Sequence, residues 1–171
     1  ILATDVQYDG DTRAVAAGVG FHDWQAAEPA VARTTRIASI ETYAPGAFYK
    51  RELPCLMALL GTFDDPPRLV IVDGFVTLGP DAHPGLGTHL FDALDRAVPV
   101  IGVAKNPFSG TPRETHVRRG TSRQPLYVTA IGLLLETAQA HIAGMHGPYR
   151  VPTLLRHVDR MARDGMAAWI T

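Results

Sequence analysis

Four charged residues occupy sequence positions that favour chemistry over simple solvation: Asp5, Glu52, Asp73 and Lys105. Asp5 interrupts a strand-like apolar segment, where an unpaired charge is costly. Asp73 and Lys105 each follow a continuous apolar run, which is typical of a strand buried on both faces. Glu52 lies in the first turns of a predicted helix. If the first strand is central in the sheet, the three carboxylates converge at one end of it.

Three carboxylates close together provide hard oxygen ligands, which suit Mg²⁺ or Mn²⁺. Such ions keep several water molecules and bind a substrate phosphate. The set therefore favours metal-assisted hydrolysis of a phosphodiester bond, with Lys105 neutralising charge on the phosphate. The structural alternative is an ion pair between Asp5 and Lys105 that joins two strands. We favour the metal site because four such residues occupy strand ends and a helix start.

The segment Thr42–Glu52, with the sequence TYAPGAFYKRE, places a turn, an aromatic ring and a carboxylate directly ahead of that helix. Pro45 and Gly46 break the preceding strand, so Tyr43 is carried on a bend where its ring need not be buried. Apolar residues at helical spacing then continue the helix to about Leu60. A solvated loop with a glutamate at the start of a helix is the alternative interpretation.

Strands and helices that could position these residues follow one another along the chain. Predicted strands cover residues 1–8, 14–22, 30–40, 69–72, 98–104 and 126–131. Predicted helices cover residues 52–60, 88–97, 136–143 and 153–163. Three antiparallel strands followed by strands that alternate with helices predict an α/β fold, a mixed sheet flanked by helices.

Composition limits the class of protein. The chain has 171 residues, 46% of them hydrophobic, with no linker or repeat, so we expect a single domain spanning residues 1–171. The single cysteine, Cys55, excludes a disulfide within the chain and fits a reducing compartment. No apolar run reaches the length of a membrane span, and no signal peptide is recognisable. We therefore expect a cytoplasmic monomer without a membrane partner.

The net charge of −1 argues against a protein that binds polyanions with its whole surface. Local charge differs from this average, because five basic residues between Lys105 and Arg123 face the single acid Glu114. More arginines follow near the carboxyl terminus. A basic side on a neutral protein suits a partner that must be both attracted and released. An ordinary solvated face is the alternative.

Short sequence blocks occur in an order that resembles the endonuclease V family. They are Asp5 within ATDVQY, Thr42–Gly46 with Arg51 and Glu52, Val72–Gly74, Ile101–Lys105 and Pro125–Val128. The resemblance covers nearly the whole chain. It implies a fold similar to ribonuclease H, with a mixed five-stranded sheet that begins with three antiparallel strands.

The resemblance also implies an activity. It is Mg²⁺-dependent cleavage of a nucleic-acid strand at the second phosphodiester bond on the 3′ side of a deaminated purine, hypoxanthine above all. The expected partner is DNA containing deaminated bases, and inosine-containing RNA is the alternative. Asp5, Glu52 and Asp73 would be metal ligands for Mg²⁺, with Mn²⁺ as the alternative ion. Lys105 would contact the phosphate that is cut, which completes the candidate catalytic set.

A wedge is the second element that the resemblance implies. Tyr43 would be its tip and would replace the stacking that a displaced base gives up. Gly74 and Gly102 would let the flipped base approach backbone amides. The expected nucleic-acid contacts are Thr42, Tyr43, Ala44, Pro45, Gly46, Gly74, His83, Gly102, Lys105 and Arg119.

The chain departs from the family's pattern at two histidines. The family usually has Gly-His after the strand that corresponds to Pro125–Val128, whereas residues 130–133 here contain no histidine. A His-Pro that usually follows Asp73 closely is replaced by Gly79–Pro80, with His83 coming later. Two alternatives therefore stay open. One is a binding module that has lost catalysis, and the other is a different nuclease of the ribonuclease H type, such as a hybrid or junction cutter.

Overall fold

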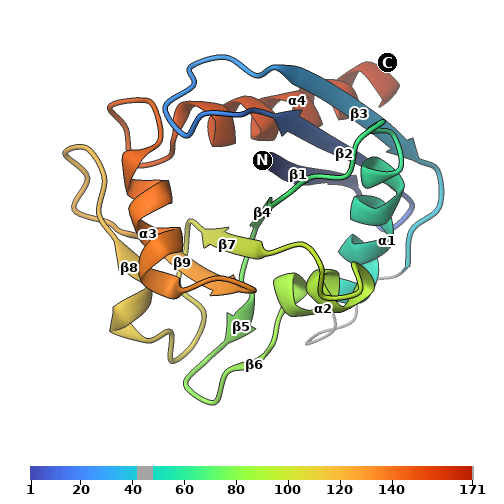
Figure 1. Ribbon diagram of the computed structural model, residues 1–171. Helices are drawn as coiled ribbons and strands as arrows, with labels where there is room; N and C mark the ends of the chain where they lie inside the picture. The colour runs from blue at the N-terminus through green and yellow to red at the C-terminus, as the bar shows by residue number, and fades with distance from the viewer. Residues whose placement is uncertain (42–47, 171) are drawn as a thin grey trace.

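A seven-stranded mixed sheet forms the centre of the protein, with helices on both faces (Figure 1). The computed structural model describes residues 1–41 and 48–170. The strand order is β3-β2-β1-β4-β7-β9-β8. These strands are β1 (Leu2–Asp9), β2 (Arg13–Gly20), β3 (Val31–Ile37), β4 (Val70–Asp73), β7 (Val100–Ala104), β8 (His116–Val117) and β9 (Leu126–Ile131). A separate small hairpin pairs β5 (Thr77–Leu78) with β6 (His83–Pro84).

Two helices cover each face of the sheet. The helices are α1 (Phe48–Leu60), α2 (Leu86–Ala93), α3 (Leu135–Gly144) and α4 (Thr153–Ile170), with a short 3₁₀ turn at Arg113–Thr115. One core lies between the sheet and α3 and α4, and includes Ile101 and Leu154. The other lies under α1 and α2, and includes Leu59 and Leu90. Within residues 1–41 and 48–170, none of the helices combines the length and the apolar character that crossing a membrane requires.

Small residues let strand β2 lie between these two layers. Its sequence is RAVAAGVG, and every residue after Arg13 is buried. Helix α4 approaches β2 at Gly165, where an added Cβ would lie 3.0 Å from Cγ1 of Val15. The absence of a side chain at Gly165 therefore permits the close packing of helix on strand.

Parallel pairing brings the candidate site residues to one edge of the sheet. Strand β1 pairs in parallel with β4, with Thr4 opposite Val72, and β4 pairs in parallel with β7, with Asp73 opposite Val103. The carboxyl ends of β4 and β7 therefore meet at the same edge, beside the middle of β1, which continues to Asp9. Asp5 lies one residue after Thr4, and Lys105 directly follows β7.

The predicted order of elements is confirmed, but three details of the prediction were wrong. The sheet has seven strands where the family resemblance implied five; the strand predicted at residues 126–131 is β9, and the short β8 beside it was not predicted. Helix α2 ends at Ala93 rather than residue 97, because Asp95 and Arg96 adopt positive φ values of 53° and 59°. Helix α4 continues past residue 163, since Met166 extends its buried stripe.

The chain that leaves β4 crosses directly over Gly102 of β7. A Cβ at Gly102 would lie 2.7 Å from the carbonyl oxygen of Gly74, 2.7 Å from Oγ1 of Thr129 and 2.8 Å from the amide nitrogen of Val76. That amide donates a 2.8 Å hydrogen bond to the Thr129 hydroxyl. Gly102 is thus required for packing of the chain on itself.

We expect Gly102→Ala to lower the free energy of unfolding by about 1–3 kcal/mol, because the added methyl overpacks rigid backbone. Denaturant unfolding of the variant and the wild type measures the difference. Gly144→Ala is the matched control, since a Cβ there meets nothing within 4 Å. Equal stability of the two alanine variants would contradict this account of Gly102.

Candidate active site

An acidic cluster lies where β4 ends beside the middle of β1. Asp5 comes from β1, Asp73 from the last position of β4 and Asp159 from α4. Each offers one carboxylate oxygen, and these three atoms all lie within 4.8 Å of one another. The structure thus brings two of the predicted residues together with a third carboxylate that the sequence analysis did not identify.

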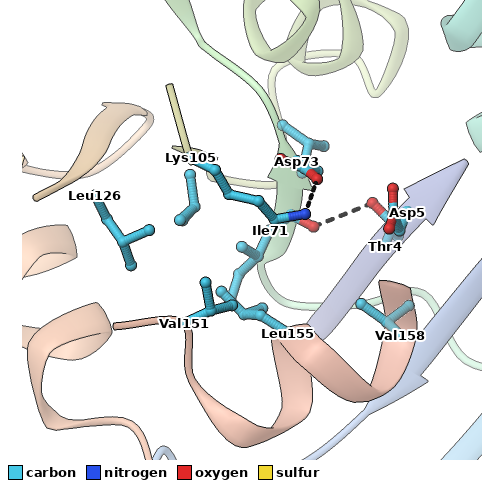
Figure 2. Close-up of a pocket in the computed structure, with 11 residues that line it drawn as sticks. Thr4, Asp5, Ile71, Asp73, Lys105, Leu126, Val151, Leu155 and Val158 are labelled. Carbon is cyan, nitrogen blue, oxygen red and sulfur yellow. Dashed lines mark hydrogen bonds and ion pairs between the residues drawn. The ribbon is translucent and has the colours of Figure 1, made fainter. Parts of the chain in front are cut away.

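Lys105 bridges two members of this cluster. Its Nζ atom donates hydrogen bonds to Oδ2 of Asp73 at 2.7 Å and to Oδ1 of Asp159 at 3.1 Å (Figure 2 shows the first of these). Burial alone would lower the pKa of Lys105, but these two carboxylates raise it above its ordinary value. The ammonium group therefore stays charged. The alternative of an Asp5–Lys105 ion pair is wrong, because Asp73 and Asp159 take that place.

Burial and the neighbouring carboxylates disfavour the ionised form of Asp5. Burial, followed by the charge of Asp73, raises the pKa of its carboxyl to about 7, against the opposing attraction of Lys105. The amide of Val6 donates a 2.8 Å hydrogen bond to Oδ1 of Asp5, which fixes the carboxyl beside the strand. The attraction of Lys105 therefore does not offset the burial of this carboxyl and the charge of Asp73.

Glu52 lies deeper than the three aspartates, on the first turns of α1. Its side chain is 4% exposed. Burial raises its pKa well above the ordinary value, and the charges of Asp5 and Asp73 act in the same direction. Glu52 is not among the three residues whose oxygens lie within 4.8 Å. It therefore belongs to the same electrostatic environment as the cluster without sharing its closest contacts.

The start of α1 is fixed by Arg51. Its Nη1 donates a 2.8 Å hydrogen bond to Asp11, and Nη2 bonds the carbonyl oxygen of Gly10 in the turn between β1 and β2. The guanidinium also lies 4.0 Å from the centre of the Tyr8 ring. These contacts hold the backbone that carries Glu52 against the end of β1.

A small hollow lies under the acidic edge (Figure 2). Its polar wall includes Asp5, Asp73 and Lys105, and its apolar floor includes Leu155 and Val158 of α4. Its volume is about 20 Å³, which is room for a single occupant the size of a water molecule or ion.

Asp159 is the residue that sequence reasoning missed. It was counted only as part of a predicted helix. It follows Val158 and shares a helix face with Leu155, and both of these residues form part of the apolar floor. An acid on such a face, with Arg156 and Arg163 one turn away on either side, is the signal that could have found it. Arg163 forms a 2.8 Å ion pair with Asp159 and helps to hold its carboxylate.

Some of the predicted nucleic-acid contacts lie outside the described residues, and others border open space or are exposed. Thr42, Tyr43, Ala44, Pro45 and Gly46 lie outside the described residues. Gly74 borders open space: its φ is +148°, and the nearest atom to an added Cβ would be Leu86 Cδ2 at 4.0 Å. His83 lies exposed on the β5–β6 hairpin, 3.9 Å from Asp81.

Gly102 and Arg119 are covered by other parts of the chain. Gly102 is covered by the chain's own backbone at Gly74 and Val76, which leaves no room for a base. Arg119 is 6% exposed, and its guanidinium donates to carbonyl oxygens of Ala143, Met145, Gly147, Tyr149 and Arg150. Its charge stabilises the loop between α3 and α4 and is not available to a phosphate.

Comparison with known proteins identifies the family. The model of the endonuclease V family matches residues 1–159. Endonuclease V of Streptomyces avermitilis is 31% identical over 97% of this chain and 80% of its own length, and that of Streptomyces coelicolor is 32% identical over 97% and 78%.

Solved structures agree in fold. The crystal structure of the Streptomyces avermitilis protein superposes with a TM-score of 0.81 at 28% identity, covering 100% of this chain and 82% of that one. Endonuclease V of Ciona intestinalis gives a TM-score of 0.79 at 18% identity, covering 98% and 85%. The predicted ribonuclease H-like fold is confirmed. The chain therefore belongs to the endonuclease V family and is a nuclease that hydrolyses phosphodiester bonds.

Proposed function

We propose that the protein cuts a DNA strand at the second phosphodiester bond on the 3′ side of a deaminated purine, with deoxyinosine as its main substrate. Family membership is the observation that carries this proposal. The Ciona intestinalis relative was crystallised with a 24mer DNA that contains an inosine followed by a ribo-adenosine, which supports an inosine-bearing strand as ligand. An inosine-containing RNA strand is the alternative substrate.

The residues at the acidic edge fit a divalent cation. Asp5, Asp73 and Asp159 offer hard oxygen atoms within 4.8 Å of one another, and the hollow beside them has room for a single ion. Burial and the charge of Asp73 raise the pKa of Asp5, and a bound cation would stabilise the ionised form of this carboxyl. We expect Mg²⁺, with Mn²⁺ as the alternative. When bound, the ion would activate water and stabilise charge on the phosphate.

The chain's own groups have distinct roles in this proposal. Asp5, Asp73 and Asp159 would hold the ion, and Glu52 would add negative charge beside it. Lys105 is already charged and aimed at Asp73, so its ammonium would donate a hydrogen bond to a phosphate oxygen at the site of cutting. Gly74 would let the substrate approach the backbone closely, and His83 would contact it from the hairpin.

Retained catalysis is favoured over a binding module. That alternative was motivated by the histidine missing after β9. Asp159 brings a further oxygen ligand to the cluster from α4, so a cation site does not depend on that histidine. A hybrid or junction cutter would share the cluster, and is distinguished by its preference among strands bearing inosine, hybrids and four-way junctions.

We expect nicking of an inosine-bearing strand in Mg²⁺ or Mn²⁺, and Asp159→Asn should lower its rate by at least about a hundredfold, as loss of a single charged group in an active site does. Gel analysis of matched DNA and RNA strands gives the rate and the preferred substrate. Asp164→Asn, an exposed aspartate on the same helix, is the matched control. Wild-type binding without a nick would contradict the proposal, and so would an active Asp159→Asn variant.

Stability should respond to pH through the same cluster. The pKa of Asp5 is about 7 in the fold against 3.8 unfolded, so between these values the native state binds more protons and the free energy of unfolding falls as pH rises. In EDTA at pH 8 we expect Asp5→Asn to raise Tm, although it abolishes nicking. The asparagine keeps the bond from Val6 and removes the charge.

Thermal melting at pH 6 and pH 8, with EDTA or Mg²⁺, measures this effect. Mg²⁺ should raise the Tm of the wild type most at pH 8, where the carboxylates are ionised, and should leave the Asp5→Asn variant nearly unchanged. A wild-type Tm in EDTA that is higher at pH 8 than at pH 6 would show that the cluster is not the source of the pH dependence.

The proposed wedge is tested by Tyr43→Ala. Loss of a stacking ring should weaken binding to an inosine-bearing duplex by about tenfold and leave binding to undamaged duplex nearly unchanged. Fluorescence anisotropy gives both affinities, and Tyr43→Phe, which keeps the ring, is the control. An equal loss of affinity on both duplexes would rule out a wedge at the lesion.

A further inference from the structure

A groove of about 470 Å³ opens beside the acidic cluster. It shares Lys105 and Asp159 with the cluster, and is otherwise lined by the loop before α4 and by one face of that helix. The other lining residues are Tyr149, Arg150, Val151, Leu155, Arg156 and Arg163. The groove is thus continuous with the site and differs from it in charge.

Basic side chains line this groove at regular spacing. Arg156, Asp159 and Arg163 are three and four residues apart, so they lie on one face of α4. Arg163 pairs with Asp159 and keeps 64% of its side chain exposed. Arg156 is exposed, and no carboxylate of the described residues lies within ion-pair distance of it. Its charge is available to a ligand.

Tyr149 faces the same groove and is 61% exposed. The guanidinium of Arg156 lies 4.7 Å from the centre of its ring, which orients the ring without burying it. An exposed aromatic ring beside an available arginine is the combination that single nucleic-acid strands bind, with a base on the ring and a phosphate on the cation.

Arg150 fixes this wall relative to the acidic cluster. Its Nη1 donates hydrogen bonds to the carbonyl oxygen of Lys105 at 3.2 Å and to Oε1 of Gln124 at 3.1 Å. The loop that carries Tyr149 is therefore hydrogen-bonded to Lys105, whose side chain contacts the acidic cluster. A strand lying in the groove would enter the site in a defined position.

We infer that this groove holds the single nucleic-acid strand on one side of the phosphate that is cut. Arg156 and Arg163 would contact consecutive backbone phosphates, and Tyr149 would stack on a base of that flank. The inference rests on the proposed function, because it takes the acidic cluster as the place of cutting. It adds a surface of the protein, outside the cluster, that binds the substrate strand.

The test compares the wild type with the double variant Tyr149→Ala, Arg156→Gln. In EDTA, anisotropy on a labelled inosine-bearing single strand should give about tenfold or more weaker binding for the variant. The plot of log affinity against log salt should lose about 0.7 from its slope, as one phosphate contact is removed. Arg96→Gln, three residues after the end of α2, is the matched control, since it removes an arginine that is 73% exposed and does not line the groove.

Shortened strands locate the flank. Two further strands each end close to the inosine, one on its 5′ side and one on its 3′ side. The difference in affinity between the wild type and the double variant should vanish on one of these strands and persist on the other. A variant that equals the wild type on the full strand overturns the inference, as does a difference that persists on both shortened strands.

Two controls separate this inference from the proposed function and from misfolding. If the wild type nicks the inosine strand and the double variant binds that strand as tightly as the wild type, the role inferred for the groove is wrong and the proposed function stands. If the wild type never nicks but the variant loses affinity on one flank, the groove stands and the function fails. Tyr149→Phe should bind within about twofold of the wild type, since its ring still stacks, and equal Tm values confirm folding.

Discussion

Crowded negative charge at the carboxyl edge of the parallel strands is the constraint on which the rest of the structure depends. Asp5, Asp73 and Asp159 place carboxylate oxygens within 4.8 Å of one another, and buried Glu52 adds to the same field. Such an arrangement is unfavourable without positive charge nearby. Lys105 supplies part of it through two hydrogen bonds, and the remainder matches what a divalent cation provides.

The fold supports this crowding by fixing each carboxylate from a different element. Parallel pairing of β1 with β4 sets Asp5 beside Asp73, and the loss of side-chain volume at Gly165 lets α4 come close to the sheet with Asp159. Arg51 anchors the helix that carries Glu52. The same helix α4 then extends the site with arginines, so that negative charge at the cluster changes to positive charge along the groove.

Local patterns were sufficient for the elements and for the residues at their ends. The apolar runs before Asp73 and Lys105 predicted buried strands, and the parallel registers carry both residues to one edge. Patterns were insufficient where a role depends on tertiary contacts. Arg119 read as a surface cation because nothing local indicates the five carbonyl oxygens that surround it, and Asp159 read as an ordinary helix residue until packing brought it to the cluster.

Calorimetric titration of the metal-free protein with Mn²⁺ tests the central claim most directly, namely that carboxylates from β1, β4 and α4 form one cation site. We expect saturable binding that tightens as pH rises, with proton release from Asp5, and a large loss of affinity in Asp159→Asn but not in Asp164→Asn. Unchanged Mn²⁺ affinity in Asp159→Asn, or binding that does not depend on pH, would contradict it.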